Sequence, residues 1–287
     1  MSRSWIVAAS CAAVGTLFAA NANAGQVVVD FNDLATGPLA GQAGGTGTTG
    51  NWAASTIPQV IAQNVTAPAA THYALAQSGT AQSVRGTSGS TNTDGQSTRA
   101  LASTLNGTVW FSFLVNPNDS GARGGISFNA LSTTNAASGA RMDAVGSGFF
   151  LSNAAGGNAT LTNTPSLTLN TGHLVVGEVI VNQSGTDDYL RLWVDPDVQT
   201  LTESTTAGQI FNGLNGDWVG NGITALAVQS YGTTGGGTVD AVRISNNPTA
   251  QSDVTGFGTP TPQPGSLTLS ALAAAPHNAR RRRQPRD

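Results

Sequence analysis

Glutamate is scarce in this chain, which contains only Glu178 and Glu203. Glycoside hydrolysis requires a pair of carboxyl groups, because one donates a proton to the leaving sugar while the other attacks the sugar or activates water. Glu178 lies in an aliphatic run, so we interpret it as an outward residue of an edge or half-exposed strand. We therefore expect no enzymatic activity, with a carbohydrate-active hydrolase as the alternative.

The residue types also give little support to nucleophilic catalysis. His72 and His173 are the histidines that precede the C-terminal tail, and no G-x-S-x-G sequence accompanies them to present an activated serine. The glycine-rich stretch 41–47 lacks the lysine of a phosphate-binding loop.

Aspartates provide the candidate metal site. Asp30 lies at the end of the first predicted strand and Asp240 lies in the last one. Terminal strands of a β-sandwich are commonly neighbours, so the two carboxylates could contribute to a structural Ca²⁺ site, which requires six to eight oxygen ligands. The alternative is that both carboxylates face solvent or accept hydrogen bonds at strand ends. No other cofactor is expected.

One strand carries the candidate ligand site. In residues 189–194 (YLRLWV), the aliphatic side chains alternate with Tyr189, Arg191 and Trp193, which therefore share the opposite face. Carbohydrate recognition needs exposed aromatic rings beside polar groups. We predict that Trp193 and Arg191 face outward and bind a ligand.

Short strands dominate the rest of the chain. Segments rich in β-branched and aromatic residues are bounded by Gly, Asn, Asp and Pro clusters, which is typical of strands joined by turns. The predicted strands are 26–31, 109–115, 125–131, 148–151, 173–182, 189–194, 223–231 and 238–245. Residues 77–97 show no apolar period and are predicted to form a surface excursion. Many strands without intervening helices indicate a sandwich or a barrel.

Charge excludes one class of partner. Only 9% of the residues are charged, and the chain has no lysine. Nucleic-acid binding needs a clustered basic face, so we expect none. A repetitive β-solenoid adhesin is a further alternative, although the glycine-rich turns follow no fixed period.

The N-terminus has the order of a secretory signal peptide. Arg3 precedes an apolar stretch from Trp5 to Ala20, and Ala22-Asn23-Ala24 supplies a small-residue cleavage site. We predict export by the secretion machinery with cleavage after Ala24. Cys11 would leave with the signal, so the mature chain would form no disulfide.

The C-terminus resembles the PEP-CTERM sorting signal of Gram-negative bacteria. Pro262-Gln263-Pro264 is followed by a modestly apolar run and by four arginines at 280–283, with Gln263 in place of the family's glutamate. The resemblance implies transient membrane anchoring through residues 259–287, a degenerate sorting tail, and processing by an exosortase near Pro262, Gln263 and Pro264. A disordered basic tail is the alternative.

Residues 25–258 resemble exported concanavalin A-like, laminin-G-like jelly-roll domains. The resemblance rests on several short blocks that occur in the family's order: 31–34 (FNDL), 37–47 (GPLAGQAGGTG), Trp52, 109–114 (VWFSFL), 192–197 (LWVDPD) and 238–244 (TVDAVRI). It implies an all-β, two-sheet antiparallel jelly-roll sandwich. The E-x-D-x-x-E strand motif of jelly-roll glucanases is absent. We therefore expect a non-enzymatic protein of the cell envelope or extracellular matrix, with a structural role or a role in binding extracellular polysaccharide.

Overall fold

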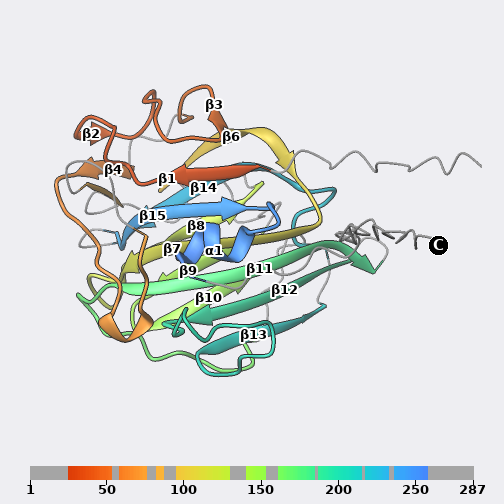
Figure 1. Cartoon of the computed structure of the whole chain (residues 1–287). Helices are drawn as coiled ribbons and strands as arrows, with labels where there is room; N and C mark the ends of the chain where they lie inside the picture. The colour runs from red at the N-terminus through yellow and green to blue at the C-terminus, as the bar shows by residue number, and fades with distance from the viewer. Residues whose placement is uncertain are drawn as a thin grey trace, which may run out of the picture.

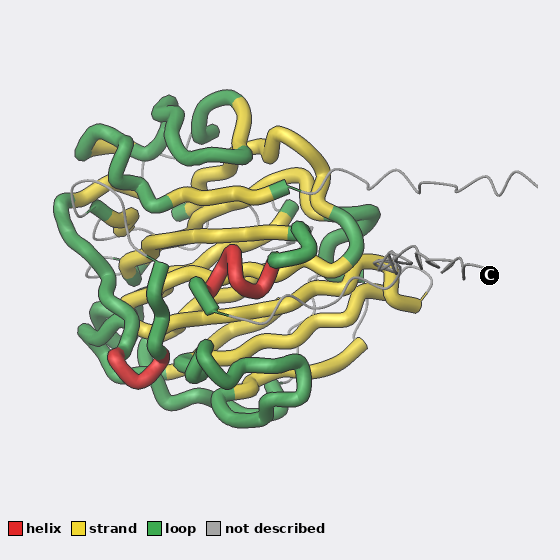
Figure 2. Tube along the Cα trace, in the orientation of Figure 1, coloured by secondary structure: helices red, strands yellow, loops and turns green. Residues whose placement is uncertain are grey.

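The protein is an all-β sandwich of two antiparallel sheets, as the sequence predicts (Figures 1 and 2). The computed structural model describes residues 25–53, 58–75, 82–86, 95–129, 140–152, 161–184, 187–214, 217–232 and 236–257. The predicted processing residues Ala24, Pro262, Gln263 and Pro264 lie outside these ranges, and so do the signal peptide and the sorting tail.

The larger sheet has nine strands in the order β13-β12-β11-β7-β15-β5-β4-β2, with β1 also paired to β15. Neighbours in this order are often distant in sequence, because the chain passes repeatedly between the two sheets. The strands are β1 (Gln26–Val29), β2 (Gly37–Pro38), β4 (Pro58–Ile61), β5 (Ser83–Gly86), β7 (Thr108–Asn116), β11 (His173–Ser184), β12 (Asp187–Val194), β13 (Gln209–Leu214) and β15 (Thr238–Ser245).

The smaller sheet has six strands in the order β10-β9-β8-β14-β6-β3. The chain crosses between the sheets from β6 to β7, from β7 to β8, from β10 to β11 and on either side of β14. This alternation in a closed pair of antiparallel sheets is a jelly roll. The strands are β3 (Thr48–Thr49), β6 (Gln96–Leu105), β8 (Arg123–Phe128), β9 (Arg141–Val145), β10 (Gly148–Ser152) and β14 (Ile223–Tyr231).

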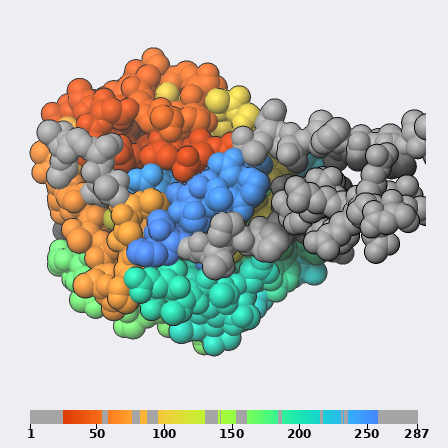
Figure 3. Space-filling view, in the orientation of Figure 1, coloured from red at the N-terminus to blue at the C-terminus, as the bar shows by residue number. Residues whose placement is uncertain are grey.

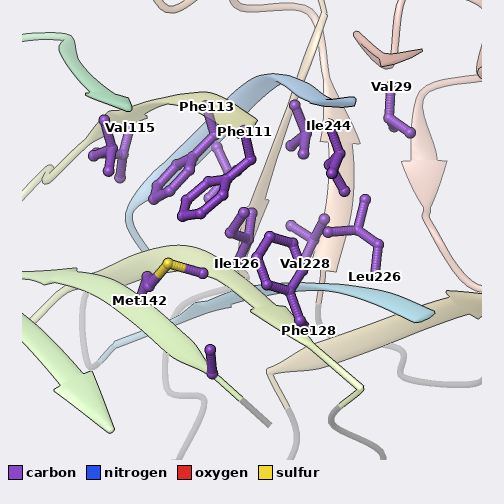
Figure 4. Close-up of a cluster of buried hydrophobic side chains, with 14 of the residues drawn as sticks. Val29, Phe111, Phe113, Val115, Ile126, Phe128, Met142, Leu226, Val228 and Ile244 are labelled. Atoms are coloured by element: carbon purple, nitrogen blue, oxygen red, sulfur yellow. The ribbon is translucent and has the colours of Figure 1, made fainter. Parts of the chain in front are cut away.

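The core lies between the sheets and follows the strand alternation. Phe111 and Phe113 of β7 point toward Ile126 and Phe128 of β8 (Figure 4). The rings of Phe111 and Phe128 meet edge to face with centroids 5.0 Å apart, a preferred geometry for aromatic pairs. Gly177 of β11 leaves room for this packing, because a Cβ there would lie 2.1 Å from the ring of Phe111.

All eight predicted strands are confirmed, but several strands were missed. The segment 77–97, predicted as a surface excursion, contains β5 (Ser83–Gly86), which lies between β15 and β4 with Val84 in the core. The next strand along the chain, β6, was missed as well, because both strands are rich in small and polar residues. Their burial comes from the partner strands, which a local pattern does not report.

The outer face of the nine-stranded sheet is partly covered by a short helix and by loops. Helix α1 (Ala250–Thr255) packs against β7 and β15, where Val254 is buried and its carbonyl accepts a hydrogen bond from Ser112 Oγ at 2.6 Å. The 3₁₀ turn η1 (Ala69–Thr71) lies in another of the covering loops. In the described part of the chain, no helix is long and apolar enough to cross a membrane.

Candidate functional site

The β11–β12 hairpin positions the candidate site. Leu190 and Leu192 point into the core between the sheets, so Tyr189, Arg191 and Trp193 lie on the outer face of the nine-stranded sheet. The predicted alternation of this strand is therefore confirmed. The outer face of the nine-stranded sheet has two parts in this region, and they differ in whether other segments cover them.

The first part is a buried apolar layer, here called the covered cluster. Trp193 of β12 stacks on Trp110 of β7 with ring centroids 5.8 Å apart and an interplanar angle of 3°. Trp193 Nε1 donates a hydrogen bond of 2.8 Å to the carbonyl of Thr205. The cluster consists of Val65, Trp110, Leu114, Leu174, Val176, Trp193, Val198, Leu201, Ala241, Ala250 and Val254.

The prediction that Trp193 is exposed to a ligand was wrong. Its side chain lies on the predicted face, but its exposed fraction is 0%. The apolar layer around it includes residues of α1 and of the loop 195–208, which directly follows β12, and the alternation of β12 reports neither of them. Trp193 stabilises the fold and offers no ring surface to a ligand.

Arg191 lies beside this cluster and joins the two glutamates of the chain. Its Nη1 forms an ion pair with Glu178 Oε2 on β11 and a second one, at 3.3 Å, with Glu203 Oε2 in the loop 195–208. The strand register places Trp110, Glu178 and Arg191 in one row across β7, β11 and β12. Sequence analysis did not predict that the two glutamates would meet.

Glu178 lies on the outer face of the sheet, as predicted, but it is fully buried and β11 is an interior strand between β7 and β12, so the interpretation as an edge or half-exposed strand was wrong. Burial raises the pKa of Glu178 from 4.5 to about 7, although the charge and hydrogen bond of Arg191 act in the opposite direction. Its Oε1 atom has no hydrogen-bond partner among the described residues.

The second part of the outer face, here called the open patch, lies on the edge strand and its neighbour. Arg191 lies opposite Asn212 of β13, and Tyr189 lies opposite Leu214. Residues paired in this way share a face of the sheet. The open patch consists of Tyr189, Arg191, Glu203, Asn212 and Leu214. Figure 3 shows this side of the molecule, with the segment around residues 190–215 in teal below the blue C-terminal helix.

The open patch combines an apolar surface with polar groups. Leu214 is the exposed large apolar side chain among the described residues, at 49%, and the side chain of Glu203 is 53% exposed. The guanidinium of Arg191 lies 4.7 Å from the centroid of the Tyr189 ring. Tyr189 Oη donates a hydrogen bond to Asn212 Oδ1, which leaves the exposed Asn212 amide nitrogen free to donate to a ligand.

The loop 195–208 holds Glu203 over the sheet through contacts at several points. Val198 N donates to the carbonyl of Thr71 at 2.9 Å, and Gln251 of α1 donates to the carbonyl of Leu201 at 2.7 Å. An exposed ion pair joins His72 Nδ1 to the carboxylate of Asp197 at 2.9 Å. Asp197 therefore has a partner outside the loop, and its Oδ1 also accepts a hydrogen bond of 3.1 Å from Gln199 N within the loop.

The carboxylates of Asp30 and Asp240 lie on paired strands but form no metal centre in the described part of the chain. β1 ends with Val29 opposite Val242 of β15, so Asp30 directly follows a strand that pairs with the strand of Asp240. Asp240 is buried, and its two oxygens accept hydrogen bonds from the backbone N–H groups of Val65 and Ala241. Among the described residues, no group of three or more His, Cys, Asp or Glu side chains could hold a metal ion. A structural Ca²⁺ at Asp30 and Asp240 stays a prediction.

His173 is occupied by structural contacts. Its Nδ1 lies 2.6 Å from Asp195 Oδ2, and its Nε2 contacts the backbone of Thr168. Burial acts to lower the pKa of His173, but the hydrogen bond and charge of Asp195 outweigh it, so the pKa is raised. No side-chain hydroxyl in the described structure lies at Nε2, so this pair is not a nucleophile and its base.

The comparisons with known proteins give a broad fold likeness. No protein-family model matches the chain, and no curated protein matches it. A Shewanella oneidensis protein of unknown function is similar in structure, with a TM-score of 0.43 and 10% identity over 77% of this chain and 85% of that one.

Two further similar structures are a cellulose-induced protein and a Caenorhabditis elegans galectin. The cellulose-induced protein has a TM-score of 0.39 and 14% identity, over 66% of this chain and 91% of its own. The galectin has a TM-score of 0.32 and 10% identity, over 52% of this chain and 89% of its own. The functional argument therefore depends on the geometry of the open patch.

Proposed function

We propose that this protein is an exported, non-enzymatic protein of the cell envelope or extracellular matrix, which binds extracellular polysaccharide through the open patch. The observation that carries the proposal is the combination of Tyr189, Leu214 and Asn212 on one exposed sheet face. A sugar ring has apolar faces and a rim of hydroxyl groups. Aromatic and aliphatic side chains pack against the apolar faces, while an amide and a carboxylate form hydrogen bonds with the hydroxyl groups.

The geometry of the patch supports this use. Tyr189 is fixed by its hydrogen bond to Asn212 and by the guanidinium of Arg191, so little rotamer freedom remains to be lost on binding. Asn212 supplies donors and Glu203 supplies an acceptor. Asn212 lies on the edge strand β13 with Leu214, and Glu203 reaches Arg191 from the loop 195–208.

Affinity electrophoresis of the full chain in gels that contain single polysaccharides tests this proposal. We expect retardation by at least one neutral polysaccharide, and its loss in Tyr189→Ala. The matched control is Asp33→Asn, an exposed site in the loop between β1 and β2, which is at the opposite end of the sheet from β13 (Figure 1). Retardation that persists in Tyr189→Ala would place the binding elsewhere.

A carbohydrate-active hydrolase is the second candidate, because the two glutamates of the chain meet at Arg191 and one of them has a pKa near 7. A carboxyl group with such a pKa suits a general acid. Against it, Glu178 has no exposed surface with which to touch a substrate. Release of reducing sugar by the full chain, abolished in both Glu178→Gln and Glu203→Gln, would favour the hydrolase over the binding protein.

Export and sorting are part of the proposal and rest on the terminal sequences. We expect the secretion machinery to cleave after Ala24, so that the mature chain begins at Gly25, and an exosortase to act near Pro262-Gln263-Pro264 after transient anchoring. Intact-mass measurement of the exported protein checks both sites at once. An N-terminus other than Gly25, or a retained C-terminal tail, would contradict the corresponding step.

A further inference from the structure

Positive charge is almost absent around the open patch. The chain has no lysine, and Arg191 is the only arginine between residues 161 and 214, the part of the chain that forms β11, β12, β13 and their loops. The same stretch contains Glu178, Glu203 and several aspartates. Within this stretch Arg191 is therefore the one permanently cationic side chain, since His173 is paired with Asp195.

Arg191 is already neutralised by carboxylates on two sides. Glu178 contacts it from the neighbouring strand, and Glu203 contacts it from the loop above the sheet. The side chain of Arg191 is only 15% exposed, and the ring of Tyr189 lies against its guanidinium. Both ion pairs use Arg191 Nη1 and little of the side chain is exposed, so a ligand carboxylate would have to compete with Glu178 and Glu203 for the guanidinium.

The carboxylates of Glu178 and Glu203 also offer more hydrogen-bond acceptors than Arg191 satisfies. The side chain of Glu178 is 1% exposed, and its Oε1 atom lacks a hydrogen-bond partner among the described residues. The surplus acceptor lies directly beside the arginine. A further anion at this place would add to an existing excess of negative groups in a poorly solvated environment, where like charges repel more strongly than in water.

We infer that Glu203 determines which glycans the open patch accepts: it admits uncharged glycans and excludes those that carry carboxylate or sulfate groups. The inference rests on the proposed glycan-binding function. Tyr189, Leu214 and Asn212 recognise the sugar irrespective of its charge, whereas the exposed carboxylate of Glu203 repels an anion beside them. Neutralising Glu203 removes the repulsion and leaves Arg191 with one fewer partner.

Isothermal titration of the full chain tests the inference with pairs of ligands that differ in charge. The probes are cello-, laminari- and mannohexaose, each beside the same oligosaccharide oxidised at C6 to the uronate. We expect the wild type to bind at least one uncharged hexaose and to bind its uronate form at least about tenfold more weakly. In Glu203→Gln, the uronate should gain about tenfold in affinity while the uncharged form changes by less than about threefold.

Asp33→Asn is the matched control, because it removes one exposed carboxylate at the other end of the sheet and so reports any effect of net charge alone. Uronates that bind the wild type as tightly as the uncharged forms, or a gain in Asp33→Asn equal to that in Glu203→Gln, would overturn the inference and leave the binding function standing. Failure of every uncharged hexaose to bind would overturn the binding function and the inference together.

Discussion

The covered cluster and the open patch lie side by side on one face of the same sheet, yet they have opposite relations to solvent. Trp193 and Tyr189 are four residues apart on β12 and point the same way, but Trp193 is fully buried while Tyr189 is only partly so. The difference comes from what lies above each residue. Helix α1 and the loop 195–208 cover Trp193, whereas the edge strand β13 beside Tyr189 carries the exposed Leu214.

Strand alternation assigns a side chain to one face of the sheet, but it does not determine whether that side chain is exposed to solvent. A sheet face becomes a second core when helices and loops outside the strands bring apolar residues to it. It becomes a binding surface where they do not. Arg191 marks the boundary, with Glu178 buried on one side and Glu203 exposed on the other.

The largest expected effect is on the covered cluster. Trp193→Ala should lower the free energy of unfolding by about 3–5 kcal/mol, because it removes a buried aromatic side chain and its stacking on Trp110. Urea denaturation measures the change. Tyr189→Ala is the comparison on the same strand and should cost about 1 kcal/mol. Equal costs for the two variants would mean that the two parts of the face do not differ as described.

The second effect is on the free energy of unfolding, and it depends on pH through Glu178 at the boundary between the covered cluster and the open patch. Because the folded state raises the pKa of Glu178 from 4.5 to about 7, it holds the proton more tightly than the unfolded chain does. Protonated Glu178 therefore contributes its full stabilisation of the folded state below pH 4.5, and this contribution is lost as the pH rises through 7. Relative to Glu178→Gln, the wild type should lose up to about 3 kcal/mol between pH 4.5 and pH 8.

Unfolding free energies of the wild type and Glu178→Gln, measured in urea at several pH values, give this difference directly. The raised pKa of His173 also makes stability fall with rising pH, but that contribution is common to both proteins and cancels. A difference that stays constant from pH 4.5 to pH 8 would show that Glu178 is ionised normally in the folded protein.

The third effect is on ligand affinity at the open patch. Tyr189→Ala should weaken binding of a neutral polysaccharide about tenfold, because the sugar loses its aromatic contact. Tyr189→Phe keeps the ring but loses the hydrogen bond to Asn212, so its affinity should fall by only about threefold. Isothermal titration distinguishes the two. A larger loss in the phenylalanine variant would mean that the hydroxyl group of Tyr189 contributes more to the affinity than its ring does.

The smallest effect is expected at the exposed end of the loop 195–208. His72→Asn removes the ion pair with Asp197 while keeping a residue type that tolerates the positive φ of 53° at this position. Exposed pairs contribute little, so the thermal midpoint at pH 6 should stay unchanged. A clear drop would mean that this pair, and not the buried contacts of Val198 and Leu201, holds the loop over Trp193.

Parts of the site could be predicted from the sequence and parts could not. The face of Arg191 and the hairpin of β11 with β12 followed from period-two alternation, which is local. Asn212 and Leu214 were missed because β13 (QIFNGL) is short and contains glycine, which weakens a strand signal. The meeting of Glu178 with Glu203 depends on a loop that folds back over the sheet, and no spacing in the sequence encodes that return.

Strand alternation and turn clusters were enough to predict a β-sandwich or a barrel, and the family resemblance of the short sequence blocks implied the two-sheet jelly roll. Only the tertiary structure decided which outer surfaces stay open. Burial of Trp193 and exposure of the open patch depend on where α1 and the loop 195–208 pack. Such packing sums many weak contacts between segments distant in the chain, and these contacts leave no periodic trace in either segment.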